Sequence, residues 1–181
     1  MRLTLPMIVA LAALLVGMTA LPAAEPEVVG PNLVPNGSFE QGLTGWGGTG
    51  KLATDQKAEG QQAARIDGDG GSKVPYVAQA SVPLESGKYY RVSLSLYRTT
   101  GQGYVYVHCN WRDRQGGRLM ISKTWAMPRA MPITSRTGEQ TGRWCRLSGI
   151  IRNQNPDLGG MQLVILLRDG ADTVYVDDVR V

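Results

Sequence analysis

The chain has 181 residues, a formal net charge of +4 at pH 7 and a single histidine. Its 19 lysines and arginines are spread along the sequence and form no clustered basic stripe, so nucleic acid is excluded as an expected partner. Without the N-terminal segment described next, about 157 residues remain, and we expect them to form one domain with a proper core.

The N-terminus is typical of a secretory signal, predicted over residues 1–24. Arg2 precedes a short apolar run from Met7 to Gly17, and small residues follow. The alternative is an uncleaved membrane anchor, but the run is shorter than the roughly 18 residues expected of a spanning helix. We therefore predict a secreted protein, extracellular or periplasmic, with no stable membrane insertion after signal cleavage. Residues 25–31 are predicted to be a spacer before a domain at 32–181.

Two segments at opposite ends of this domain place carboxylates among apolar residues. Glu40 lies in the segment 32–46, and Asp177 and Asp178 lie in the terminal segment 174–181. Both segments are expected to be extended. A carboxylate in such surroundings is costly unless a cation or hydrogen-bond donors meet it. We expect the two segments to close the domain together.

Between these ends the chain consists of short alternating segments separated by Gly, Asn, Asp and Pro. About nine strands in one domain predict an all-β jelly-roll β-sandwich of two antiparallel sheets. The stretch 126–142, with Pro128 and Pro132, is expected to be a long irregular loop. The clearest strands are predicted at 63–66, 76–84, 89–98, 104–111, 144–152, 161–168 and 173–181.

The alternation also predicts which side of each strand is buried, because successive side chains point to opposite faces. In 89–98 the core side is Tyr90, Val92, Leu94 and Leu96. In 104–112 the apolar side is Val105, Val107 and Cys109. The other side of this second strand is polar and aromatic, with Tyr104, Tyr106, His108, Asn110 and Arg112.

The two cysteines, Cys109 and Cys145, are both predicted to point inward from strands. In an exported chain they are able to form a disulfide. Two buried free thiols are the alternative, because free cysteine is among the most buried residue types. The sequence leaves both open.

Four motifs, in this order, resemble the CenC-type carbohydrate-binding modules of families four, nine and twenty-two. They are the opening segment 32–46, the segment 86–93, Gly142-Arg143-Trp144, and the segment 174–179. These modules are galactose-binding-like jelly rolls. The resemblance implies a non-catalytic domain that binds polysaccharide in a cleft or on a concave sheet.

The resemblance also implies a structural calcium ion near the first and last strands. Carried over by position, Glu40 and Asp177 are the expected ligands, with Asp178 as the substitute. This agrees with the preference of calcium for hard oxygen ligands. Alternatively, Glu40 and Asp177 accept backbone N–H bonds across the first and last strands.

Sugar binding requires exposed aromatic rings, on which a pyranose stacks, beside polar groups that bond its hydroxyls. The predicted residues are Tyr104, Tyr106, His108, Asn110, Arg112 and Trp125. Tyr89, Arg91 and Tyr97 join them if their strand lies in the same sheet. Alternatively, the tyrosines only stabilise a sheet surface as cross-strand pairs, and Trp125 anchors the following loop to the core.

Catalysis is not indicated. There is no Gly-x-Ser-x-Gly, phosphate-binding loop or zinc motif. Asp55, Glu59, Asp67, Asp113 and Glu139 are the carboxylates that a glycoside hydrolase would have to pair, and all lie in or beside turn-like segments.

We therefore predict a secreted, monomeric carbohydrate-binding module whose partner is a polysaccharide or other glycan, and we expect it to be associated with a glycoside hydrolase. One alternative is a surface or matrix interaction domain without sugar binding. The other is a small polysaccharide-degrading enzyme.

Overall fold

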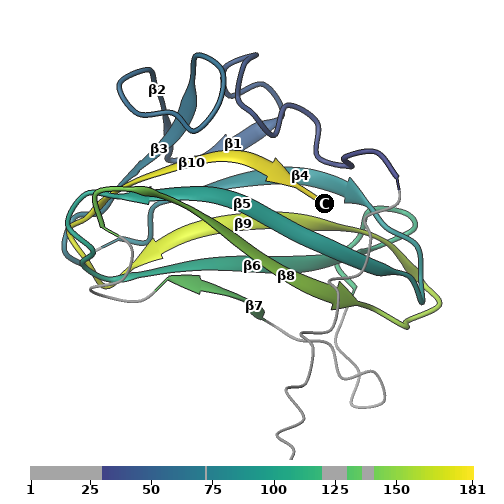
Figure 1. Cartoon of the computed structure of the whole chain (residues 1–181). Helices are drawn as coiled ribbons and strands as arrows, with labels where there is room; N and C mark the ends of the chain where they lie inside the picture. The colour runs from purple at the N-terminus through teal and green to yellow at the C-terminus, as the bar shows by residue number, and fades with distance from the viewer. Residues whose placement is uncertain (1–29, 72, 120–129, 136–140) are drawn as a thin grey trace, which may run out of the picture.

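The computed structural model describes residues 30–71, 73–119, 130–135 and 141–181 (Figure 1). These residues contain no helix, so none that could cross a membrane. The strands are β1 (Trp46–Gly48), β2 (Lys51–Ala53), β3 (Ala63–Asp67), β4 (Tyr76–Pro83), β5 (Tyr89–Arg98), β6 (Tyr104–Asp113), β7 (Ala130–Ser135), β8 (Trp144–Arg152), β9 (Leu158–Arg168) and β10 (Thr173–Arg180).

The described strands form two antiparallel sheets of five strands each. One sheet has the order β1-β4-β9-β6-β7, and we call it the β9 sheet after its central strand. The other has the order β2-β3-β10-β5-β8, and we call it the β10 sheet. Figure 1 shows the two sheets packed as layers, with β7 at the outer edge of the β9 sheet. This confirms the predicted all-β jelly-roll sandwich.

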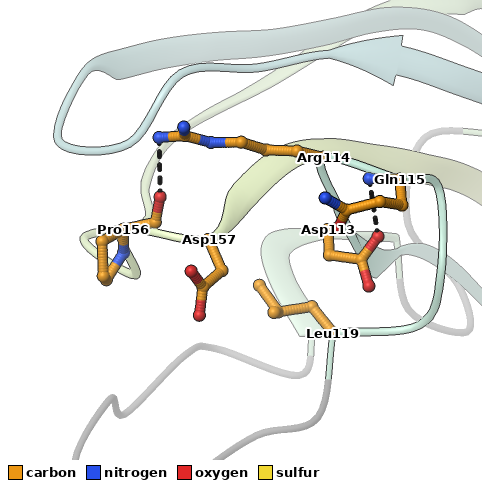
Figure 2. Close-up of a pocket in the computed structure, with 6 residues that line it drawn as sticks. All are labelled: Asp113, Arg114, Gln115, Leu119, Pro156 and Asp157. Atoms are coloured by element: carbon orange, nitrogen blue, oxygen red, sulfur yellow. Dashed lines mark hydrogen bonds between the residues drawn. The ribbon is translucent and has the colours of Figure 1, made fainter.

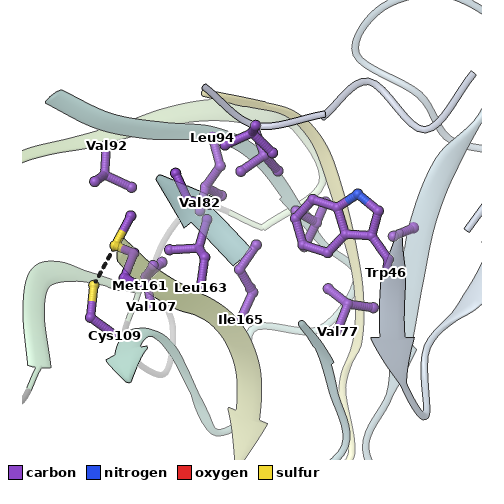
Figure 3. Close-up of a cluster of buried hydrophobic side chains, with 14 of the residues drawn as sticks. Trp46, Val77, Val82, Val92, Leu94, Val107, Cys109, Met161, Leu163 and Ile165 are labelled. Carbon is purple, nitrogen blue, oxygen red and sulfur yellow. Dashed lines mark hydrogen bonds between the residues drawn. The ribbon is translucent and has the colours of Figure 1, made fainter. Parts of the chain in front are cut away.

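The core lies between the sheets and is built from the inward side of each strand. Val92, Leu94 and Leu96 of β5 are at most 1% exposed, as their alternation predicts. Figure 3 shows Val92 and Leu94 in one cluster with side chains of β6 and β9. Leu163, Ile165 and Leu167 of β9 are fully buried. Side chains on the other side of the central strand are half-buried or exposed, and they belong to the site described below.

Three features of the chain differ from the sequence-based expectation. The segment 32–45 is a series of turns rather than an extended strand, although it does hydrogen-bond to the end of β10. β1 and β2 are three-residue strands that were not predicted. β7 lies inside the expected long loop; Pro132 is compatible with it because β7 is an edge strand. The rest of that loop, 126–129 and 136–140, is outside the described residues.

Both cysteines are free thiols in the structure, but only Cys109 is buried, so the alternative of two buried free thiols holds for that residue alone. Cys109 is buried, with its Sγ 3.2 Å from the Sδ of Met161 (Figure 3), and burial raises the pKa of its thiol to about 12. Cys145 is only half-buried, because it lies on the edge strand β8.

A fully buried ion pair joins the end of β5 to the approach to β10. The Nε of Arg98 lies 2.9 Å from the Oδ2 of Asp172, and neither side chain is exposed. Asp172 also accepts hydrogen bonds from the N–H groups of Thr100 and Gly101. The guanidinium group donates to the carbonyl oxygens of residues 102 and 103. Every charge of the pair therefore has partners, which is the condition for tolerating burial.

Replacing Asp172 by asparagine should destabilise the fold strongly. D172N leaves the Arg98 guanidinium buried without its counter-charge, and breaking such a pair costs about 3–5 kcal/mol. Urea unfolding followed by tryptophan fluorescence measures this as a lower midpoint at an unchanged slope. D169N, at an exposed aspartate in the same turn, is the control and should change little. Equal stability of D172N and the wild type would contradict this role for the pair.

The same carboxylate makes the fold sensitive to acid. Burial opposes ionisation of Asp172, but the Thr100 N–H, the guanidinium of Arg98 and two threonine hydroxyls outweigh it and hold the pKa of Asp172 below its ordinary value. The stabilisation is therefore complete above the unfolded-state pKa of about 4 and is lost as pH falls through the lower folded-state value. Melting temperatures between about pH 6 and pH 2 should fall more steeply in the wild type than in D172N. Parallel curves for the two proteins would refute the prediction.

Candidate functional site

The outward side of the β9 sheet carries an exposed strip of aromatic and polar side chains, which we call the β9 face. Successive side chains of these strands point alternately to the core and to the outside, so the residues of the strip and the buried core residues lie on opposite sides of one sheet. The β9 face consists of Tyr76 of β4, Tyr104, Tyr106, His108, Asn110 and Arg112 of β6, and Gln162, Val164, Leu166 and Arg168 of β9.

One end of the β9 face is aromatic. Tyr76 and Tyr106 are both register partners of Leu166, one on each side, which places their Cα atoms about 10 Å apart at two strand spacings. The rings of Tyr104 and Tyr106 lie with centroids 6.0 Å apart and planes tilted by 34°. Tyr76 and Tyr104 are each 38% exposed. The three rings form an accessible apolar platform on the sheet.

The other end is polar. The Nδ2 of Asn110 donates to the Oε1 of Gln162 at 2.9 Å, and Arg112 reaches the same oxygen at 3.5 Å. His108 lies between the two ends, beside Val164. From Tyr104 to Arg112 the strip is about 26 Å long at the usual rise of an extended strand.

The structure places five of the six predicted sugar-binding residues on this one face: Tyr104, Tyr106, His108, Asn110 and Arg112. Trp125 lies outside the described residues. Tyr89, Arg91 and Tyr97 do not join the face, because β5 belongs to the β10 sheet. On that sheet Tyr97 packs between other aromatic rings, with centroids 5.7 Å from Trp144 and 5.9 Å from Tyr175.

The β9 face also contains residues that the sequence analysis missed, and two of its aromatic and amide side chains are among them, Tyr76 and Gln162. Both lie in strands that were predicted, at 76–84 and 161–168. They were missed because alternation within a strand does not show which strands are neighbours in a sheet. Only the register brings Gln162 opposite Asn110 and brings Tyr76 near Tyr106.

A polar pocket of about 610 Å³ opens beyond the end of β6, one residue past Arg112 (Figure 2). Asp113 uses its Oδ1 within its own turn, accepting the N–H of Gln115 at 2.9 Å. Arg114 spans the pocket and donates to the carbonyl oxygen of Pro156 at 3.0 Å, as Figure 2 shows. The lining residues are Asp113, Arg114, Gln115, Leu119, Pro156 and Asp157.

The carboxylates considered for hydrolysis serve the fold where the structure describes them. Asp55 accepts the hydroxyl of Tyr175, Asp67 bonds a lysine and an arginine, and Asp113 bonds its own turn. Glu59 lies 3.8 Å from an exposed arginine. The remaining candidate, Glu139, is outside the described residues.

Glu40 and Asp177 converge on the loop between β2 and β3. Asp177 is fully buried and its Oδ2 accepts the N–H groups of Ala58 and Glu59 at 2.8 and 3.0 Å. Glu40 uses Oε1 for the N–H groups of residues 61 and 62 at 2.9 and 3.1 Å. Both carboxylates therefore accept backbone N–H bonds, but from residues 58–62 rather than from the first strand. Burial raises the pKa of Asp177 despite these bonds.

At this loop Glu40 leaves one carboxylate oxygen for a hard cation, whereas both oxygens of Asp177 accept backbone N–H groups, its Oδ1 that of Asp178 at 2.7 Å. The Oε2 of Glu40 accepts no hydrogen bond from the residues that the structure describes, and Asp177 contacts no cationic side chain among them. Asp178 instead forms ion pairs with Arg146 and Arg180. The described residues contain no cluster of three metal-binding His, Cys, Asp or Glu side chains. A calcium ion here would therefore need backbone carbonyl oxygens as well.

A two-sheet jelly roll with tyrosines and amides exposed on one sheet is the architecture of a carbohydrate-binding module. The family model of the carbohydrate binding domain CBM_4_9 matches residues 31–127, more than half of the sequence. The chain belongs to this family, which confirms the resemblance to these modules and the assignment to a polysaccharide-binding class. No curated protein matches the chain significantly.

Solved structures similar to this chain include carbohydrate-binding modules, at identities that bear on the fold alone. A family 16 carbohydrate-binding module has a TM-score of 0.58 at 17% identity, covering 82% of this chain and 97% of its own. The CBM22-1 xylan-binding domain from Paenibacillus barcinonensis Xyn10C has a TM-score of 0.53 at 17% identity, covering 79% and 88%. The CBM22-1-GH10 modules of Clostridium thermocellum xylanase 10B, complexed with xylohexaose, match at a TM-score of 0.57 and 16% identity, covering 81% and 27%.

Proposed function

We propose that the chain binds polysaccharide along the β9 face and is not itself a catalyst. The observation that carries this proposal is the continuous strip of three tyrosines followed by an amide and guanidinium cluster. The residues of this strip that lie on β6, from Tyr104 to Arg112, follow one side of that strand for about 26 Å, with Tyr76 of β4 and Gln162 of β9 beside them. This is the combination that sugars need, because a pyranose has an apolar face and a rim of hydroxyls.

The order of residues along the strip suggests how a glycan lies on it. Sugar rings stack on Tyr76, Tyr104 and Tyr106, which have exposed area and little side-chain entropy to lose. Hydroxyls further along the chain bond to Asn110 and Gln162, whose amides are already held in place by each other. A strip of this length suits several successive units of an extended chain.

Among the described residues, the use of the candidate carboxylates by the fold supports a binding role. The described carboxylates that were candidates for hydrolysis are used in hydrogen bonds or ion pairs of the fold. In the Clostridium thermocellum protein, a module of this fold is solved together with a GH10 module. We propose by analogy that this chain is secreted and acts as a monomeric accessory to a glycoside hydrolase.

We also propose that calcium binds at the 58–62 loop through Glu40 and Asp177. The ion would supply positive charge to two carboxylates that hold the same loop. Such a site would stabilise the loop between β2 and β3 and the turns around Glu40. It lies away from the β9 face, since Asp177 belongs to the β10 sheet.

Removing two stacking rings should abolish most glycan binding. The double variant Y104A/Y106A should bind soluble polysaccharide at least about tenfold more weakly, because stacking contacts contribute on the order of 1 kcal/mol per ring. Affinity gel electrophoresis against a panel of soluble polysaccharides measures the shift in Kd. The matched control is Y89A, at a tyrosine that is 68% exposed on the other sheet.

Two results would contradict the proposal. If Y104A/Y106A binds like the wild type, the β9 face is not the site. If the wild-type protein is retarded by no polysaccharide in the panel, the alternative of an interaction domain without sugar binding is favoured.

Calcium removal should lower the melting temperature by several degrees. A ligand that binds only the folded state stabilises it by mass action, and chelation withdraws that contribution. Differential scanning fluorimetry with and without chelator measures the shift, and added calcium should reverse it. D177N should reduce the response to chelator. An unchanged melting curve, together with no metal found by elemental analysis, would refute the proposal.

A further inference from the structure

We infer that the β9 face selects glycans that carry anionic groups, either uronate carboxylates or sulfate esters. This inference rests on the proposed function and adds the chemical class of the ligand. It follows from three observations: the charges of the sheet, one arginine without a carboxylate partner in the described part of the chain, and the balance of hydrogen-bond donors and acceptors on the face.

The β9 sheet is almost free of acidic residues. β1, β4, β7 and β9 contain no Asp or Glu, and β6 contains none before its last residue, Asp113. The carboxylate of Asp113 is used by its own turn, where it accepts the N–H groups of residues 115 and 117. Arg112 and Arg168, by contrast, both point outward on this sheet. The face is therefore cationic.

Arg112 is half-buried and has no counter-charge among the residues that the structure describes. Its side chain reaches the Oε1 of Gln162 at 3.5 Å, a long contact to an oxygen that Asn110 already occupies at 2.9 Å. No carboxylate among the described residues lies within ion-pair distance of its guanidinium group. An arginine held in this way offers a planar fork of N–H donors that matches a carboxylate or sulfate group.

Arg168 marks the opposite end of the face. It is the register partner of Tyr104, whereas Arg112 is the register partner of Gly160. Its only ion pair in the described residues is with Asp169 at 3.4 Å, and both side chains are more than half exposed, so that pair is weak. Two cationic side chains thus lie about 26 Å apart at the two ends of the tyrosine and amide strip.

The β9 face also has more hydrogen-bond donors than free acceptors, which favours an anionic ligand as the charges do. Sugar hydroxyls both donate and accept, and a carboxylate is the strongest side-chain acceptor for them. The described strands offer no carboxylate on this face; the acceptors are amide and phenolic oxygens, and one of them, Gln162 Oε1, is already occupied. The two guanidinium groups supply only donors. A ligand with many acceptor oxygens and negative charge satisfies this excess.

The test compares anionic and neutral polysaccharides on the same protein. Affinity electrophoresis or calorimetry is performed with polygalacturonate and alginate for carboxylates, dextran sulfate for sulfate esters, and xylan and β-glucan as neutral chains. We expect at least tenfold tighter binding to one or both anionic classes, weakened by added salt. The class that binds more tightly identifies the source of the anionic group.

Arginine variants on and off the β9 face test whether this face is the source of the preference for anionic chains. R112Q should lower the ratio of anionic to neutral affinity at least tenfold, and R112Q/R168Q should lower it further. R143Q removes the same charge from an exposed position next to β8 on the other sheet and is the matched control, expected to keep the ratio. Melting curves confirm that each variant is folded. Y104A/Y106A should weaken binding to the anionic chain as well.

The outcomes separate this inference from the proposed function. Equal or tighter binding to neutral chains overturns the inference and leaves the proposed function standing. No binding to any chain overturns the proposed function itself. A preference for anionic chains that R112Q/R168Q retains, or binding to anionic chains that Y104A/Y106A does not weaken, would be general attraction between a basic protein and a polyanion, and it would overturn the inference.

Discussion

The buried ion pair between Arg98 and Asp172 is the constraint on which the arrangement of the sheets depends. Its two charges require partners, and those partners are the backbone of the turn between β5 and β6. This turn carries the chain from the β10 sheet to the β9 sheet. The turn ends at Gly103, which has a φ of 76°. A Cβ atom at this position would lie 2.5 Å from the carbonyl oxygen of Arg168, so only glycine fits. Tyr104 follows directly, so the ion pair fixes where the first tyrosine of the β9 face stands.

The two sheets have different charges and different roles. In the β10 sheet, Asp177 lies in β10 and holds the 58–62 loop together with Glu40, so the acidic residues there close the fold. The β9 sheet contains a single acidic residue among its strands, at the end of β6. Its outward side therefore holds no carboxylate of the described strands that closes the fold in this way. Side chains on that side are available for a ligand.

Features that depend on residues within one strand were predictable from the sequence, whereas features that depend on pairing between distant strands were not. Two-residue alternation correctly predicted the inward sides of β5 and β6, because it reflects burial within one strand. Strand neighbours depend on long-range pairing, so the sheet of Tyr97 and the roles of Tyr76 and Gln162 were not predicted. β1 and β2 are too short to show alternation, and β7 was predicted as loop because it contains Pro132. The segment 32–45 looked extended, but Asn36 holds it in turns through three hydrogen bonds of its side-chain amide.

A site on a sheet face can change its ligand without changing the fold. Tyr106 and Arg112 alternate along β6 with buried residues such as Val107 and Trp111, so each outward substitution leaves the inward packing in place. The register with β9 holds every outward residue at a fixed spacing from its neighbours. Ligand class is then decided by which side chains occupy these fixed positions. In the binding mode that we propose for this face, the tyrosines supply stacking, which any pyranose can use. Arg112, which has no carboxylate partner among the described residues, supplies the discrimination.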